Sequence, residues 1–190
     1  MSSEGKVIIV SAPSGSGKST LINEALQKFP QLEFSVSACS RPKREHEIDG
    51  QHYYFLTVEQ FKEQIQQNLF VEWEEVYPNN FYGTKQSEID RIWQKGNVAM
   101  FDVDVKGGLN LKKYFGNKAL SIFIQPPSIE VLKERLQNRG TETPETLNKR
   151  LSKAEYELSF ANQFDKIILN DDLKTAQQEI VSIIAHFLEC

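Results

Sequence analysis

Short apolar segments alternate with helical patterns over most of the chain. Four runs rich in apolar and β-branched residues predict buried strands, at 6–12, 97–104, 119–125 and 166–170. Apolar residues at helical spacing predict the helices that follow these strands, at 18–29, 107–114, 128–138 and 172–188. Since consecutive parallel strands need a crossover connection, the alternation predicts an α/β fold with a parallel β-sheet core and helices on both faces.

The segment 35–96 interrupts this alternation. It contains, in order, a polar loop (CSRPKREHEIDGQ), a strand at 53–57, a helix from about 58, a strand at 69–76 and a turn (YPNNFYGT). A second irregular segment covers 139–160, where Thr143 is the expected N-cap of a helix and Pro144 its first residue. We therefore predict a core with two insertions, the first of them a small mixed α/β unit.

Composition narrows the possible classes of function. The chain has 190 residues and a net charge of −4, which argues against a general nucleic-acid-binding protein. No apolar run approaches the roughly 20 residues that span a bilayer, and the N-terminal MSSEGKVIIVSAPSG lacks the pattern of a signal peptide. The two distant cysteines, Cys39 and Cys190, favour a reducing compartment. These features predict a cytoplasmic protein without a membrane segment.

Two features predict a site for phosphate. The first predicted strand runs directly into APSGSGKST and then into a helix, which is the context that a P-loop requires. Gly15 and Gly17 allow successive backbone N–H groups to point inward, Lys18 can reach the β- and γ-phosphates, and the Ser19 hydroxyl can ligate Mg²⁺. In addition, five of the six arginines fall into two groups, at 41–44 and 135–150. Clustered arginine on an acidic protein indicates a local anion site.

Six segments indicate a family of P-loop proteins that the chain resembles. Over essentially its whole length the chain resembles the guanylate kinase family of nucleoside monophosphate kinases, in SAPSGSGKST, FSVSACSRPKREHEIDGQHYYF, FVEWEEVYPNNFYGT, FDVDVKGG, LKERLQNRGTETPETLNKRL and ILNDDL. The resemblance implies an ATP:GMP phosphotransferase that uses Mg²⁺. It also implies three parts: a core (1–34, 97–125 and 161–190), a GMP-binding insertion (35–96) and a mobile lid (126–160).

The resemblance further implies which residues contact the acceptor, GMP. The expected GMP-binding residues are Ser37, Arg41, Arg44, Tyr53, Glu72, Tyr82, Thr84 and Asp104. Arg41, Arg44 and Tyr53, with Tyr82, are assigned to the phosphate, because a dianion needs several donors in fixed geometry. Glu72 is assigned to the guanine N1–H and 2-amino group, a pair of donors that adenine lacks, and the remaining residues lie around the base. From strand periodicity alone Glu72 would be expected to face solvent.

The resemblance also implies which residues contact ATP, the phosphoryl donor, and the metal ion. The expected ATP-binding residues are Ser14, Gly15, Ser16, Gly17, Lys18, Ser19, Thr20, Arg135, Asn170 and Asp171. The expected metal contacts are Ser19 and, through water, Asp102, which shares a strand face with Asp104. The residues expected to act in catalysis are Lys18, Arg44, Arg139 and Arg150, with the last two closing from the lid. The acceptor is already an oxyanion, so alignment and charge neutralisation suffice without a general base.

Two alternatives remain open from the sequence. One is a small kinase of the same fold that acts on adenylate or a phosphorylated sugar, against which Glu72 and Thr84 argue. The other is a guanylate-kinase-like protein-interaction module, although such modules typically lose the P-loop and lid residues that this chain keeps. The expected partners are the small molecules ATP and GMP, with dGMP as a further acceptor. No nucleic acid, membrane or obligate protein partner is expected.

Overall fold

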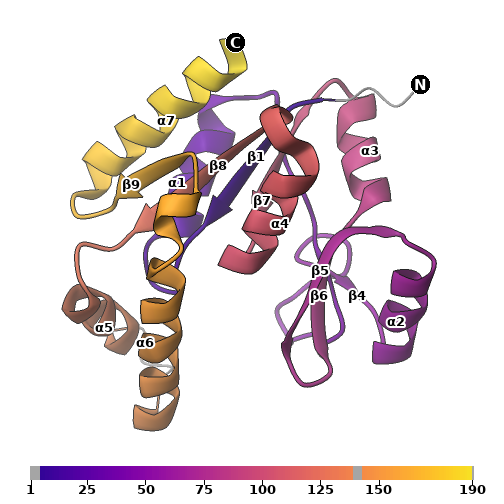
Figure 1. Ribbon diagram of the computed structural model, residues 1–190, viewed down its shortest axis with the longest axis horizontal. Helices are drawn as coiled ribbons and strands as arrows, with labels where there is room; N and C mark the ends of the chain where they lie inside the picture. Colours follow the sequence, from indigo (N-terminus) through magenta and orange to yellow (C-terminus); the bar gives the residue numbers. More distant parts are fainter. Residues whose placement is uncertain (1–4, 139–142, 190) are drawn as a thin grey trace.

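Five parallel strands form the main sheet in the computed structural model, which describes residues 5–138 and 143–189 (Figure 1). In spatial order the strands are β2 (Leu32–Phe34), β7 (Val98–Asp102), β1 (Val7–Ser11), β8 (Ala119–Gln125) and β9 (Lys166–Leu169). The four predicted strands are therefore confirmed, with ends that differ by one or two residues. Among the strands of the main sheet, only β2 was not predicted, because three residues are too few to show a period.

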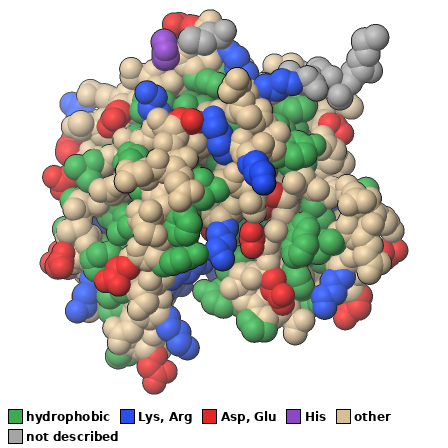
Figure 2. All heavy atoms as spheres, viewed as in Figure 1, with side chains coloured by type: hydrophobic (Ala, Val, Ile, Leu, Met, Phe, Trp, Pro, Cys, Tyr) green, Lys and Arg blue, Asp and Glu red, His purple; other side chains and the backbone are tan. Residues whose placement is uncertain are grey.

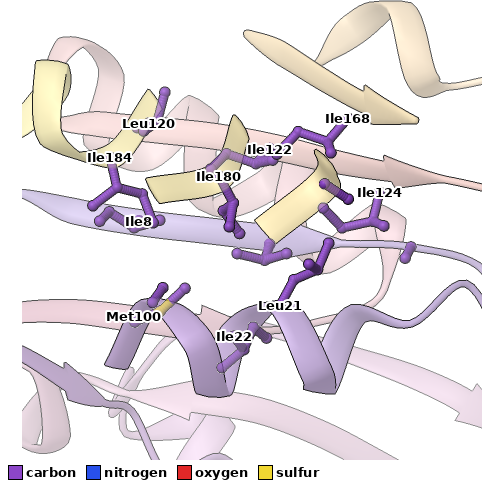
Figure 3. Close-up of a cluster of buried hydrophobic side chains, with 14 of the residues drawn as sticks. Ile8, Leu21, Ile22, Met100, Leu120, Ile122, Ile124, Ile168, Ile180 and Ile184 are labelled. Carbon is purple, nitrogen blue, oxygen red and sulfur yellow. The ribbon is translucent and has the colours of Figure 1, made fainter. Parts of the chain in front are cut away.

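Helices cover both faces of the main sheet, as predicted. One face carries α1 (Lys18–Lys28) and α7 (Leu173–Glu189), and the other carries α3 (Gln86–Gln94) and α4 (Val105–Phe115). Successive residues of β1 serve opposite faces, so that Ile8 packs with Leu21 and Ile180 (Figure 3), whereas Ile9 packs with α3 and α4. Both faces of β1, β7 and β8 are buried over most of their length, which explains the continuous apolar runs of these three strands.

A second, smaller sheet lies beside the carboxyl ends of the main strands. Its spatial order is β4 (Tyr54–Phe55), β3 (Ala38–Cys39), β6 (Asn80–Lys85) and β5 (Phe70–Tyr77), with one parallel pair and two antiparallel pairs. Helix α2 (Val58–Gln66) covers it by inserting Phe61 against Ala38 and Phe81. This is the mixed α/β unit that the sequence predicted.

The predicted turn at YPNNFYGT is wrong in extent. Only Pro78 and Asn79 form the turn, and β6 begins at Asn80, directly opposite Tyr77. Asn79 adopts a left-handed conformation with φ of 61°, which favours a tight two-residue hairpin connection. The Pro, Asn and Gly residues of this segment are typical of a turn and gave no sign of a strand. Phe81 and Thr84 are nevertheless buried, Phe81 against Ala38 and Phe61 and Thr84 beside Glu72 of the neighbouring strand.

The two remaining α-helices, α5 (Ile129–Gln137) and α6 (Pro144–Leu158), lie next to the P-loop. They contact each other through Leu132, Leu136, Leu147 and Ala154. Thr143 caps α6, as predicted, by accepting the Thr146 backbone N–H at 3.3 Å, and Pro144 is the first helical residue. Two short 3₁₀ turns, at Gly116–Lys118 and Ala161–Gln163, precede β8 and β9. Within residues 5–138 and 143–189, every helix is too short or too polar to cross a bilayer.

Candidate functional site

The loop between β1 and α1 has the conformation of an anion-binding turn. Gly15 and Gly17 have φ of 95° and 89°, and α1 begins directly afterwards at Lys18. A Cβ atom at Gly17 would overlap Nδ2 of Asn170, which donates to the Ser16 carbonyl at 2.7 Å. Glycine is therefore required at 17 both by backbone angle and by the approach of Asn170.

Two aspartates lie where the main sheet meets this loop. Asp102 ends β7 and forms an ion pair with the Lys18 ammonium group. Asp104 lies beyond the strand, as the N-cap of α4, and accepts the Gly107 N–H at 2.8 Å. The two residues were predicted to share one face of a strand. Both do line the same cavity, although Asp104 reaches it from a helix terminus.

A cavity of about 670 Å³ lies between the P-loop, α6 and the second sheet. Figure 2 shows the hollow between these parts, with basic and acidic side chains at its margin. The predicted site residues that line it are Ser14, Gly15, Gly17, Lys18, Ser19, Thr20, Ser37, Arg44, Tyr53, Glu72, Tyr82, Asp102, Asp104 and Arg150. The lining does not include Ser16, Arg41, Thr84, Arg135, Asn170 and Asp171.

Glu72 is a buried carboxylate in the wall of the cavity. It points from β5 toward α4, and only 9% of it is exposed, contrary to the expectation from periodicity. Its Oε1 accepts the Thr84 hydroxyl at 2.8 Å, across the β5–β6 ladder. Burial, together with the nearby charges of Asp104 and Glu74, raises the pKa of Glu72 to about 7. The α4 helix can approach because it has Gly107, where a Cβ would lie 3.2 Å from Glu72 Oε2.

Two arginines of the polar loop before β4 have different environments. Arg41 is held by hydrogen bonds within the loop, whereas Arg44 lines the cavity. The guanidinium group of Arg41 donates to both carboxylate oxygens of Glu47, at 2.7 Å to Oε2, and lies 5.1 Å from the Tyr53 ring centroid. The Arg44 backbone N–H donates to the same Glu47 carboxylate at 2.8 Å. Hydrogen bonds from Arg41 lower the pKa of Glu47 to about 2. Glu47 thus organises the loop, a role that sequence reasoning did not identify.

Residues from α5, α6 and the end of β9 surround the P-loop. Arg150 of α6 donates to the Ser14 hydroxyl at 3.0 Å, so the helix reaches over the loop. Arg135 of α5 donates to the carbonyl of Asn170 at 3.0 Å, which joins it to the residue that holds Ser16. Asp171 follows in the exposed turn before α7. Arg139 lies outside the described residues, and its role stays a prediction.

Sequence reasoning missed two further cavity residues on α6. Lys153 and Glu157 line the cavity three and seven positions after Arg150. Their Nζ and Oε1 atoms are 3.7 Å apart, and Lys153 also lies 5.9 Å from the Tyr77 ring centroid, across the mouth of the cavity. This spacing places all three on one helical face, so that extending the stripe from Arg150 would have found them.

The chemistry of the available donors fits a magnesium ion held together with a nucleotide. Magnesium is commonly bound by one or two protein oxygens plus phosphates and waters. The hydroxyl of Ser19, in the first turn of α1, and the carboxylate of Asp102 both line the cavity. Within the described residues there is no cluster of three or more His, Cys, Asp or Glu that could hold a metal by itself.

The fold and the site together define a P-loop nucleotide-binding protein with a second sheet opposite its phosphate-binding turn. The model of the guanylate kinase family matches residues 4–187. A guanylate kinase of Bacteroides fragilis is 54% identical over 97% of this chain and 91% of its own length, and one of Porphyromonas gingivalis is 50% identical over 96% and 98%. The crystal structure of guanylate kinase from Anaplasma phagocytophilum matches with a TM-score of 0.76 and 28% identity, over 96% of this chain and 85% of that one. The chain belongs to the guanylate kinase family.

Proposed function

We propose that the cavity between the P-loop and the second sheet is where this protein transfers a phosphoryl group from ATP to GMP. The protein catalyses ATP + GMP → ADP + GDP, and this activity replaces the two alternatives that the sequence left open. The observation that carries our assignment is the buried Glu72–Thr84 pair, in which Glu72 lines the same cavity as Lys18 from the opposite wall.

On the donor side, the P-loop amides and Lys18 would hold the β- and γ-phosphates of ATP. Ser19 and, through water, Asp102 would hold Mg²⁺, which neutralises phosphate charge when bound. The ion pair between Lys18 and Asp102 keeps the ammonium group at the phosphate-binding turn before a nucleotide enters. Arg135 and Asn170 would support the loop on the adenine side, through the hydrogen bonds that link them to Ser16.

On the acceptor side, Arg44, Tyr53 and Tyr82 line the wall that would bind the GMP phosphate. Arg41 would act from behind this wall, because Glu47 and the Tyr53 ring already hold its guanidinium group. Glu72 would accept both guanine donors, and Thr84 fixes the orientation of that carboxylate. Ser37 and Asp104 complete the base side of the cavity.

Transfer would need alignment rather than a general base, since the attacking group is a phosphate oxygen. We propose 35–96 as the GMP-binding part, 126–160 as the lid, and 1–34, 97–125 and 161–190 as the core. Arg150 reaches the P-loop from the lid segment, where it can neutralise charge on the transferring group. Closure of this segment would also exclude water, which would otherwise hydrolyse ATP.

The proposal extends to the setting of the reaction. We propose a cytoplasmic protein that acts on small molecules alone, with dGMP as a second acceptor and without nucleic acid, membrane or an obligate protein partner. The net charge of −4 supports the exclusion of nucleic acid, and the buried free thiol of Cys39 is compatible with a reducing compartment.

Arg150→Ala is expected to lower kcat by about 10²-fold or more while changing KM for GMP by less than about threefold. The reason is that Arg150 lies at the P-loop, where charge develops during transfer, and not at the acceptor wall. Steady-state kinetics with varied GMP measures both constants. Lys149→Ala, an exposed cation on the same helix, is the matched control. A rise in KM with unchanged kcat would remove Arg150 from the catalytic group.

GMP affinity is expected to fall as pH falls from 8 to 6. The pKa of Glu72 is about 7 without a ligand, and two guanine donors stabilise its anion, so binding below pH 7 must release a proton. Affinity should drop about tenfold from this group, and about twofold from the GMP phosphate, whose second pKa is near 6. Calorimetry at both pH values on the parent and Glu72→Gln separates the two causes. The variant should keep only the twofold change, and an equal pH dependence in both proteins would contradict the assignment.

A further inference from the structure

The chain crosses between its two sheets twice, and a cluster of polar side chains lies beside both crossings. The outward crossing, 35–37, joins β2 of the main sheet to β3 of the second sheet. The return crossing is α3, which leads from β6 back to β7 (Figure 1). The polar cluster consists of Glu88 and Arg91 of α3 with their partners, and none of these residues lines the cavity.

Glu88 is the centre of this cluster. It is only 2% exposed, and its two carboxylate oxygens accept four hydrogen bonds. Oε1 accepts from the Val36 backbone N–H at 3.0 Å and from Arg91 Nη2 at 2.8 Å, and Oε2 accepts from the Tyr54 hydroxyl at 2.9 Å and from Arg91 Nε at 3.0 Å. Burial alone would raise the pKa of Glu88, but these donors outweigh it and lower the pKa. Glu88 is thus a buried carboxylate with its acceptor capacity filled.

The partners of Glu88 are next to two residues of the acceptor wall. Val36 precedes Ser37, and Tyr54 follows Tyr53, and both Ser37 and Tyr53 line the cavity. The Tyr54 backbone N–H also donates to the Ser37 carbonyl at 2.9 Å, so the two wall segments are joined. Glu88 therefore holds the wall from behind, at one residue's distance from each side chain that faces the cavity.

The polar cluster has a second half, which is built around the carboxylate of Glu33 and joins different parts of the molecule. Glu33 of β2 accepts from Arg91, from Lys95 Nζ at 2.8 Å and from Asn97 Nδ2 at 2.8 Å. All of these residues belong to the main sheet, to α3 or to the connection between them. The Glu33 half thus fixes α3 to the main sheet, whereas the Glu88 half fixes the second sheet to α3.

We propose that Glu88 is a positioning residue that sets the affinity for GMP by fixing the Ser37–Tyr53 wall relative to the P-loop. The proposal rests on the proposed function, in which that wall contacts GMP. If the ties from Glu88 are removed, the wall samples orientations that do not bind GMP. Apparent affinity then falls by the fraction of molecules that remain competent, and saturating GMP restores that fraction. ATP binding is unaffected because the P-loop belongs to the main sheet.

Tyr54→Phe and Glu88→Gln test this directly by steady-state kinetics. Tyr54→Phe keeps the ring, including its contact with Lys85, and removes one hydrogen bond to a charged group. We expect KM for GMP to rise about tenfold, with KM for ATP and kcat within about twofold of the parent. Glu88→Gln should raise KM for GMP at least as much. Glu33→Gln is the matched control, expected to lower the melting temperature while leaving KM for GMP unchanged.

Each outcome bears on the proposal. If KM for GMP stays at the parent value in Tyr54→Phe while the melting temperature falls, the cluster is only structural and the inference is overturned. An equal rise in Glu33→Gln also overturns it, because general destabilisation would then account for the effect. Should Glu88→Gln fail to fold, Tyr54→Phe still decides. Arg44→Ala in the same assay tests the proposed function separately: if it leaves KM for GMP unchanged, the assignment of the wall to GMP fails, whatever Tyr54→Phe does.

Discussion

Lys18→Met is expected to lower kcat/KM for ATP by about 10³-fold or more with the fold intact. Methionine keeps most of the length of the side chain but removes the ammonium group, which is the only part that a phosphate can contact. The ammonium group lies at the cavity, paired with Asp102 rather than packed in the core. Its removal also leaves Asp102 without its cation, and an unpaired carboxylate repels the triphosphate.

A coupled assay of ADP release measures this effect, with circular dichroism and the melting temperature as checks on folding. Lys28→Met is the matched control, because Lys28 lies in the last turn of the same helix, away from the P-loop. The control should retain the turnover of the parent. If Lys18→Met did so too, the interpretation of Ala12–Thr20 as the phosphate-binding loop of the reaction would be wrong.

Glu72→Gln is expected to lower kcat/KM for GMP by at least about 10²-fold, equivalent to about 2.7 kcal/mol. Guanine presents N1–H and the 2-amino group as adjacent donors, and a carboxylate accepts both. Glutamine keeps the shape but turns one acceptor into a donor, which would face a guanine donor in a buried pocket. The Thr84 hydroxyl can still donate to the remaining oxygen, so the loss falls on the guanine contact.

An acceptor screen with GMP, IMP, AMP, CMP and UMP shows whether Glu72 sets base selectivity. The parent should prefer GMP, and the preference over IMP should shrink in Glu72→Gln, because IMP lacks the 2-amino group. KM for ATP should change little. Glu75→Gln on the same strand is the control, since Glu75 does not line the cavity and glutamine can still accept from Asn79. If Glu72→Gln phosphorylates GMP as well as the parent, our account of guanine recognition fails.

Local patterns in the sequence determined the main sheet and its phosphate-binding loop. The strands β1, β7 and β8 are buried on both faces, so each shows as an apolar run that needs no knowledge of its neighbours. The P-loop is likewise local, because two glycines, a lysine and a serine act within one turn at the start of α1. The start of α6 at Thr143 and Pro144 could also be predicted from the sequence, since a helix cap needs only a few consecutive residues.

The tertiary structure decided the features that depend on residues far apart in the chain. Strand β6 lies in a segment that has the composition of a turn, and it is a strand because β3 and β5 pair with it. Glu72 is buried because α4 packs over β5, and Glu88 finds two of its donors, on Val36 and Tyr54, in distant segments. A glutamate in a strand carries no apolar signal that marks it as buried, so the burial of Glu72 and the distant contacts of Glu88 follow only from the assembled fold.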